Sequence, residues 1–346
     1  MIKGTKMMKF LRMNASRSFE FGEQAIPKPE LGQSLLKVKA VGVNHADYIE
    51  SLGKYKNTGA KASKILGIEF VGQKVDPDRL DLLLSPNLYG GIVNGGAFGE
   101  YVAINEGHLI PFEPEVSVEK AAGIPEGFLT AFQLIEHYFK DVSPGKVAYV
   151  TGAAGGVGSS LVQLLKSRYG CKVATAVGGA EKAEYVKRLG ADWVFDHKAI
   201  SHDEIVSAVL ERTEGRGVDA VFDGMGASDA EFHLRLLSVD STWVLYGLLG
   251  RSEGPSLSKF FNELLFKRVR LCTSTLKSRS DEYKTELISN FNQKVMPLFR
   301  ENKIHARIGN LYHIDFSKEE DAKVMDLAFK KLRQRDNIGR HVVLFK

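Results

Sequence analysis

The glycine-rich segment from Val147 to Gly158 constrains the fold of this chain more than any other feature. It opens with the apolar, β-rich run Val147–Val150 and ends in a turn that carries four glycines. A helix-forming run, Ser159 to Arg168, follows at once, so the order is strand, turn, helix. A turn in this context binds the pyrophosphate of a dinucleotide. The segment therefore predicts a nucleotide-binding βαβ unit.

The glycines of this turn have separate physical tasks. The pattern reads A-x-G-x-x-G from Ala153, so an alanine replaces the usual first glycine. Gly155 lets the backbone approach a pyrophosphate, and Gly158 lets the helix pack close to the strand. The helix N-terminus offers unpaired N–H groups and a partial positive charge to the phosphates. The predicted cofactor contacts in this turn are Ala154, Gly155, Gly156, Val157 and Gly158.

The end of the next strand indicates which dinucleotide is bound. The strand Cys171–Val177 runs into Gly178 without an acidic residue at its tip, where NAD enzymes usually place one for the ribose hydroxyls. Lys182 follows and would attract a 2′-phosphate. Glu181 is the opposing signal, because it could bind a ribose diol. The pattern favours NADPH over NADH, with Gly178 and Lys182 as contacts.

Length and composition set the broad class. A chain of 346 residues exceeds one typical core and predicts two domains. No apolar run reaches the ~20 residues that span a membrane, and Met1–Met13 lacks the apolar region of a secretory signal. Two cysteines, Cys171 and Cys272, give no disulfide framework, which suits a reducing cytoplasm. The net charge of +5 is mild, and an anionic cofactor accounts for it as well as nucleic acid would.

The pattern of apolar residues divides the chain into three parts. Residues 1–128 are rich in short β runs and Gly/Pro turns, whereas residues 129–271 alternate strands with helices. Such alternation predicts right-handed βαβ units, and hence an α/β fold with a doubly wound parallel sheet. Residues 272–346 are mixed and have too little core to stand alone, so we expect them to fold back onto the N-terminal part.

Several sequence blocks, in this order and at this spacing, resemble those of the zinc-free medium-chain dehydrogenases/reductases, in the quinone oxidoreductase (zeta-crystallin-like) branch. The later blocks look closest to the tumour-suppressor-induced quinone oxidoreductases. The resemblance covers nearly the whole chain. The blocks that carry it are 43–47, 65–69, 121–125, 130–134, 153–158, 243–248, 264–268 and 337–340.

The resemblance implies a β-rich GroES-like catalytic domain, residues 1–128 and 272–346, and a Rossmann dinucleotide-binding domain, residues 129–271. It also implies a homodimer, since Thr242–Gly247 resembles the segment through which relatives pair their sheets. Further cofactor contacts follow from it at Thr130, Gly224, Met225, Gly247, Leu248, Asn337 and Arg340. Arg340 could equally be a surface cation beside a strand, with no role in binding the phosphates.

The chain departs from the family pattern at three places. Relatives often have a tyrosine near the 2′-phosphate where this chain has His197, which could bind phosphate or be merely solvated. The loop at residues 71–80 is altered, which puts the substrate range in doubt. Relatives that resemble the later blocks have a serine where Gly155 stands, so we expect one phosphate contact fewer here.

The residues present argue against zinc. The alcohol-dehydrogenase branch places a cysteine where this chain has Asn44 or His45, and a histidine where it has Ile68. Isoleucine cannot bind a metal, and two cysteines cannot form a four-cysteine zinc loop. We therefore predict a site without metal, which suits quinones and conjugated enones because they accept hydride without a Lewis acid.

Hydrogen-bond donors must then meet the oxygen charge that develops on the acceptor. In the family they come from the turn after the third strand, which here offers the Asn44 amide and the Tyr55 phenol, with Tyr48 as a weaker candidate. Asn44 could instead bond its own backbone in a turn, and Tyr55 could be a half-buried aromatic.

The function that this resemblance implies is hydride transfer from NADPH to a quinone. An NADPH-dependent enal or enone reductase shares the same fold and chemistry. A non-catalytic NADPH- and RNA-binding crystallin-like protein is a third alternative, although the chain shows no RNA-binding motif.

Overall fold

The computed structural model describes residues 5–55, 65–250 and 254–346, which form two compact units. Unit 1 comprises residues 1–129, 276–300 and 305–346, and unit 2 comprises residues 130–275 and 301–304. The main borders lie one and four residues from those expected from the sequence. The short insertion at 301–304 had no counterpart in that expectation.

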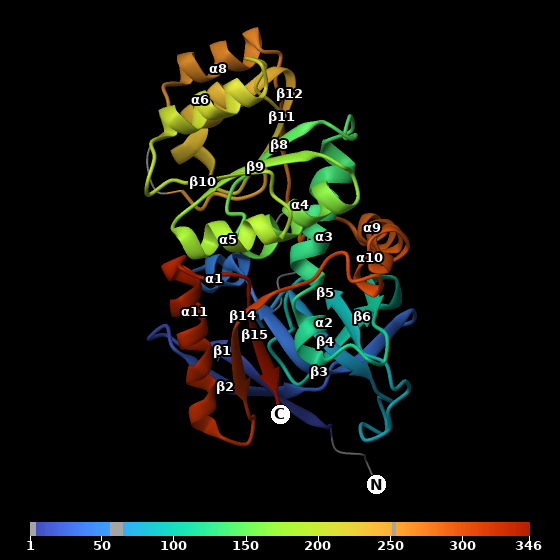
Figure 1. Cartoon of the computed structure of the whole chain (residues 1–346). Helices are drawn as coiled ribbons and strands as arrows, with labels where there is room; N and C mark the ends of the chain where they lie inside the picture. The colour runs from blue at the N-terminus through green and yellow to red at the C-terminus, as the bar shows by residue number, and fades with distance from the viewer. Residues whose placement is uncertain (1–4, 56–64, 251–253) are drawn as a thin grey trace. The chain divides into compact units, whose positions relative to one another are not determined.

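Unit 2 is built on a parallel sheet, which confirms the predicted fold class (Figure 1). Its described strands, in spatial order, are β10 (Trp193–Asp196), β9 (Lys172–Val177), β8 (Val147–Val150), β11 (Val218–Asp223), β12 (Leu237–Leu245) and β13 (Arg270–Thr273). Within this sheet β8 comes first in the sequence, β9 and β10 are added in turn on one side of it, and β11 then lies on its other side. The switch point between β8 and β11 is where a doubly wound sheet opens its ligand crevice.

Helices cover both faces of this sheet, so its central strands are largely apolar and mostly buried. Figure 1 shows α4 and α5 on one face, and α6 and α8 on the other. The helices are α4 (Gly156–Ser167), α5 (Ala180–Arg188), α6 (His202–Arg212), α7 (Ala230–Leu236) and α8 (Leu257–Phe266), with η2 (Leu134–Tyr138) and η3 (Gly226–Asp229) as short turns.

The position of β12 corrects one expectation about pairing between copies. The segment Thr242–Gly247 was expected to pair sheets, but β12 has β11 on one side and β13 on the other. Among the described strands the free edge beside it is β13. An edge-to-edge pairing would therefore use β13.

Unit 1 is β-rich, with a mixed sheet and a separate hairpin. The sheet runs β14 (Ile308–Ile314), β15 (Arg340–Phe345), β3 (Gln33–Val43), β4 (Glu69–Lys74), β5 (Tyr89–Ile92) and β7 (Leu109–Pro111), with β6 (Tyr101–Asn105) on β3. The hairpin joins β1 (Met7–Met13) to β2 (Phe19–Ala25). Because β15 pairs antiparallel with β3, with His341 opposite Val43, the end of the chain completes the sheet begun near its start.

Helices and a large aromatic core stabilise unit 1. The helices are α1 (His45–Ser51), α2 (Val118–Ala122), α9 (Asp281–Lys294), α10 (Met296–Arg300) and α11 (Val324–Gln334), with η1 (Glu106–His108) and η4 (Glu319–Lys323). Helix α3 (Pro125–Gln133) contains the border between the units. Phe329 of α11 packs edge-on against Phe19 at 5.0 Å and against Phe98 at 6.5 Å. The apolar face of α11 thus covers the core of unit 1.

Candidate functional site

The turn after β8 has the backbone geometry of an anion-binding helix start. Gly152 has φ +60°, and the N–H of Gly155 donates to the carbonyl of Gly152 at 2.9 Å. Gly155 is the N-cap of α4, and no side chain caps this terminus. The first N–H groups of a helix have no partner within the helix, so they are available to phosphate oxygens.

The two glycines that sequence reasoning singled out differ in how tightly they are packed. A Cβ at Gly158 would lie 2.3 Å from the carbonyl oxygen of Gly152, so the turn admits no side chain there. A Cβ at Gly155 would meet that oxygen at 3.4 Å, an ordinary contact. Gly158 is therefore required by the fold itself. The reason for Gly155 is the predicted approach of a ligand.

Two further turns are tied to the first, and we call the turns 151–158, 223–226 and 246–248 together the three-turn rim. The Thr151 hydroxyl accepts from the N–H of Gly224 at 2.8 Å. A Cβ at Gly247 would lie 2.8 Å from the carbonyl oxygen of Gly224. The structure thus brings the predicted contacts Gly224, Met225, Gly247 and Leu248 to the same edge of the sheet as the glycine turn.

Asp223 organises the second turn of the rim, and the sequence analysis missed it. Its carboxylate accepts from the N–H groups of Met225 at 2.7 Å and Gly226 at 3.1 Å, and from the Trp243 indole at 3.1 Å. Burial alone would raise the pKa of Asp223, but the His233 ring at 3.4 Å and these N–H groups hold that pKa below its ordinary value. Its sequence signal was an acidic residue at the end of a buried strand.

Some groups near the end of β9 favour NADPH, and another opposes it. His197 lies against Gly178, because a Cβ at Gly178 would be 3.1 Å from the His197 ring. Asp196, which sequence reasoning passed over, accepts from the N–H of Gly179 at 2.9 Å. Hydrogen bonds from backbone N–H groups lower the pKa of Asp196. A carboxylate beside the predicted 2′-phosphate position opposes the attraction that Lys182 and His197 would provide.

Unit 1 holds a buried polar cluster, which we define as Asn44, Asp47, Glu69 and Arg340. Glu69 is fully buried and pairs with the guanidinium of Arg340. The Asn44 amide donates to Glu69 Oε1 at 2.8 Å and accepts from Arg340 Nη1 at 2.9 Å. The second Glu69 oxygen accepts from the N–H of Glu126 at 2.8 Å. Chain segments that are distant in sequence meet here.

The cluster changes how two predicted residues are interpreted. Burial lowers the pKa of Arg340 to about 10, so it is a cation at neutral pH. Its guanidinium binds Glu69 and Asn44 within unit 1, and a phosphate contact would require those bonds to open. The Asn44 amide nitrogen donates one N–H to Glu69 and lies 3.5 Å from the carbonyl of Gly42, so only its second N–H could serve an acceptor. Both roles stay predictions.

Asp47 belongs to the cluster and caps the N-terminus of α1. Its Oδ2 accepts from the N–H of Asn44 at 2.9 Å, whereas its Oδ1 is buried without a hydrogen-bond partner. Burial raises the pKa of Asp47 to about 7. The neighbouring His45 is half-buried, and desolvation lowers its pKa to about 4. At neutral pH the helix start therefore holds a neutral histidine beside a carboxyl group whose pKa is raised by burial.

The two tyrosines predicted near the acceptor have different surroundings. Tyr48 packs edge-on against Phe329 at 6.1 Å under the guanidinium of Arg333, so it belongs with the core. Tyr55 is half-buried, and the ammonium of Lys277 lies 5.1 Å from its ring centroid. Burial raises the pKa of Tyr55 to about 12, so its phenol keeps its proton at neutral pH and can donate.

The remaining predicted contacts are buried or engaged within their own unit. Thr130 is buried on α3. The Asn337 amide donates to the carbonyl of Lys331 at 2.9 Å and accepts from Asn310 at 3.3 Å. These observations do not test whether Thr130 or Asn337 contacts the cofactor, so both contacts stay predictions.

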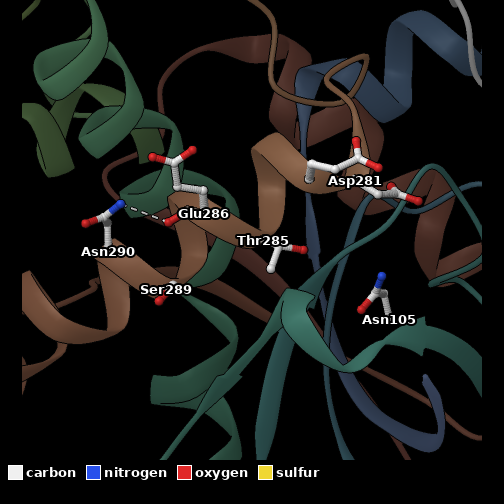
Figure 2. A pocket seen from close by; sticks show the side chains of 7 residues that line it. Asn105, Asp281, Thr285, Glu286, Ser289 and Asn290 are labelled. Atoms are coloured by element: carbon white, nitrogen blue, oxygen red, sulfur yellow. Dashed lines mark hydrogen bonds between the residues drawn. The ribbon is translucent and has the colours of Figure 1, made fainter.

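A hollow of about 530 Å³ on unit 1 lies along α9 and is acidic (Figure 2). Figure 2 shows Asp281 and Glu286 on its wall, where the carbonyl of Glu286 accepts from the Asn290 amide at 3.0 Å. Its third carboxylate is Glu282. Three carboxylates repel phosphate, so this hollow is no candidate for the dinucleotide.

The described part of the chain has neither a cluster of metal-binding side chains nor a membrane-spanning helix. Residues 5–55, 65–250 and 254–346 contain no group of three or more His, Cys, Asp or Glu side chains that could hold a metal ion. In the same ranges, every helix is too short or too polar to cross a bilayer.

Comparison with known proteins places these features in a family context. A family model described as zinc-binding dehydrogenase matches residues 156–293. A synaptic vesicle membrane protein VAT-1 homolog from Danio rerio is 27% identical over 91% of this chain and 65% of its own length. A 2-methylene-furan-3-one reductase from Solanum lycopersicum is 30% identical over 59% of this chain and 53% of its own length. The chain thus spans less than two thirds of either relative.

One solved structure is similar to this chain over nearly its whole length. The quinone oxidoreductase of Thermus thermophilus, solved alone and with NADPH, is 26% identical and superposes with a TM-score of 0.77, covering 97% of this chain and 99% of that one. Together these likenesses support the predicted medium-chain dehydrogenase/reductase superfamily and, within it, quinone oxidoreductase-like proteins. The narrower resemblance to the tumour-suppressor-induced branch stays a prediction.

Proposed function

We propose that this chain is an NADPH-dependent quinone oxidoreductase that works without zinc. The observation that carries the proposal is the three-turn rim, whose uncapped helix start and close-packed glycines suit a pyrophosphate. The likeness to a quinone oxidoreductase solved with NADPH supports the choice of cofactor and acceptor. The overall reaction is NADPH + quinone + H⁺ → NADP⁺ + hydroquinone.

The residues of the chain would bind, orient and supply a proton. The N–H groups of Gly156 to Gly158 would hold the pyrophosphate, and Lys182 with His197 would meet the 2′-phosphate against the opposing charge of Asp196. When bound, NADPH supplies the hydride. The phenol of Tyr55, which holds its proton at neutral pH, would donate to the acceptor oxygen as negative charge develops there.

The absence of zinc is part of the proposal. Where the alcohol-dehydrogenase branch has a histidine ligand, Ile68 is a buried apolar residue, and Glu69 is paired with Arg340. A carboxylate neutralised by a guanidinium in this way is a poor site for a second cation. Metal analysis of the purified protein, by atomic emission, would test this: one zinc per chain would overturn it.

The first experiment measures NADPH oxidation with 1,2-naphthoquinone, with NADH as the parallel cofactor. Turnover with NADPH and little with NADH would support the whole proposal. Equal turnover would leave the quinone activity and remove the NADPH preference. Absence of quinone turnover, with NADPH still bound, would overturn the proposed reaction.

A second candidate is an NADPH-dependent enal or enone reductase. The relative from Solanum lycopersicum favours it, since it is named as a reductase of a conjugated enone. Turnover of α,β-unsaturated aldehydes but of no quinone would select this candidate. RNA binding without any turnover would select the crystallin-like alternative.

We also propose that the chain forms a homodimer through the edge strand β13 and helix α8. No described residue of α8 is buried, although the helix carries a strongly apolar side. Its exposed apolar side chains are Leu257, Phe261, Leu265 and Phe266, and Leu271 on β13 is 40% exposed. A free strand edge can pair antiparallel with its own copy about a two-fold axis. Sedimentation of the protein and of F261E should give a dimer and a monomer respectively, and a monomeric wild type would overturn this.

A further inference from the structure

Lys277 is a buried lysine with a defined anion partner and a defined aromatic partner. It is 5% exposed, and its ammonium donates to Glu50 Oε2 at 2.6 Å. The same ammonium lies 5.1 Å from the centroid of the Tyr55 ring. All three residues belong to unit 1: Glu50 and Tyr55 are near neighbours in the sequence, and Lys277 comes 227 residues after Glu50. A buried ammonium needs a counterion, and Glu50 supplies it.

The geometry lets Lys277 act on Tyr55 in two ways. A cation within about 6 Å of an aromatic face is attracted to it, so the ammonium restricts the orientation of the ring. A positive charge there also stabilises the phenolate relative to the phenol, which makes the hydroxyl a stronger donor. The ion pair with Glu50 and the burial of the Lys277 side chain hold the ammonium in place. Neither of these constraints depends on Tyr55.

We propose that Lys277 is a positioning residue that orients the Tyr55 phenol and strengthens it as a donor to the acceptor oxygen. The inference rests on the proposed function, because it needs an acceptor whose oxygen gains charge. It adds a residue to that site for which the sequence pattern gave no signal. Lys277 itself need not touch the acceptor.

The charges around Tyr55 set the direction of the expected pH effect. The charged groups that shift the pKa of Tyr55 are Glu126, Glu50 and Asp47, all acidic. Each of them raises the pKa of the phenol, together with burial. Lys277 supplies a positive charge over the same ring, 5.1 Å from its centroid. Its removal should shift any rate dependence on the Tyr55 proton to higher pH.

The first test is a double-mutant cycle with a quinone acceptor. We expect K277M to lower kcat about tenfold, within the range of general acid catalysis, and to leave the KM for NADPH within about twofold. In a Y55F background the same substitution should change kcat less than about twofold, because Lys277 acts through the missing hydroxyl. K277R should restore most of the activity, since it keeps a cation over the ring.

A matched control and a stability safeguard complete the cycle. R333M removes the cation over Tyr48, a ring in the core, and should leave the pH profile of kcat unchanged. Because K277M leaves the Glu50 carboxylate unpaired, K277Q/E50Q serves as a neutral pair if K277M unfolds. Equal losses of kcat from K277M in the wild-type and Y55F backgrounds would overturn the proposal.

A second readout separates this inference from the proposed function. Protein labelled with 3-fluorotyrosine should show one ¹⁹F resonance that is lost in Y55F. In K277M, but not in R333M, that resonance should titrate at higher pH than in the wild type. If the protein reduces no quinone but its Tyr55 resonance still shows this shift, the proposed function is wrong, whereas the influence of Lys277 on Tyr55 stands. Unchanged titration in K277M would overturn the influence of Lys277 on Tyr55.

Discussion

The three-turn rim of unit 2 and the buried polar cluster of unit 1 are built in opposite ways. The rim relies on main-chain N–H groups and glycines, and its central turn is one continuous stretch of sequence. The cluster relies on charged side chains that stand up to 296 residues apart, such as Asn44 and Arg340. A backbone site can be recognised in the sequence as a motif. A side-chain site of this kind exists only once the sheet has formed.

The largest effect we expect comes from breaking the cluster. In R340M the Glu69 carboxylate would be buried without its counterion, and such losses cost about 3–5 kcal/mol. We expect the free energy of unfolding of unit 1 to fall by that amount, measured by hydrogen exchange of β3 and β15. The matched control is R300M, which removes an exposed pair with Glu113 and should cost less than about 1 kcal/mol. Equal costs would show that the cluster does not stabilise unit 1.

Asp47 should give the cluster an unusual pH dependence. Its folded pKa of about 7 lies above the ordinary value of 3.8, so its contribution to stability is complete below pH 4 and is lost as pH rises through 7. We expect D47N to gain stability relative to wild type over this window, by up to about 4 kcal/mol. Urea unfolding at several pH values measures it, and parallel curves for the two proteins would contradict it.

The half-buried His45 and the buried His341 act in the opposite direction across part of the same window. Burial lowers the pKa of both His45 and His341 to about 4, below their ordinary value of 6.5. Their contribution is therefore complete above pH 6.5 and is lost as pH falls through 4. The difference between D47N and wild type isolates the carboxyl group from this background.

The rim offers a test in which packing and ligand contact separate. G158A places a Cβ 2.3 Å from a carbonyl oxygen, so we expect unit 2 to lose about 1–3 kcal/mol and NADPH binding together. G155A meets only an ordinary 3.4 Å contact and should keep its melting temperature. If Gly155 faces the pyrophosphate, G155A should still bind NADPH more weakly. Unchanged binding in G155A would place the pyrophosphate elsewhere.

The smallest effect concerns cofactor preference. K182A should raise the Kd for NADPH about tenfold, or about 1.4 kcal/mol, and leave that for NADH unchanged. K187A, on an exposed position of the same helix, is the matched control. Isothermal titration with both cofactors measures the difference. Equal weakening for NADPH and NADH would mean that Lys182 does not meet the 2′-phosphate.

The sequence predicted the parallel sheet and its glycine turn well, because both depend on local order. Strand, turn and helix follow one another within residues 147–168, and the structure has β8 and α4 there. The requirement for Gly158 could be stated in advance from the motif alone. Asp223, in contrast, was passed over, because its partners Trp243 and His233 lie on later elements.

The sequence by itself determined the fold class, the glycine turn and the list of side chains able to do chemistry. Periodicity and turn residues are local, and local order is preserved in the folded chain. Only the tertiary structure decided that Arg340 pairs with Glu69, that Tyr48 belongs to a core, and that Lys277 lies over Tyr55. Those contacts depend on strand pairing between distant segments, such as β15 with β3, which brings charges together that no spacing in the sequence relates.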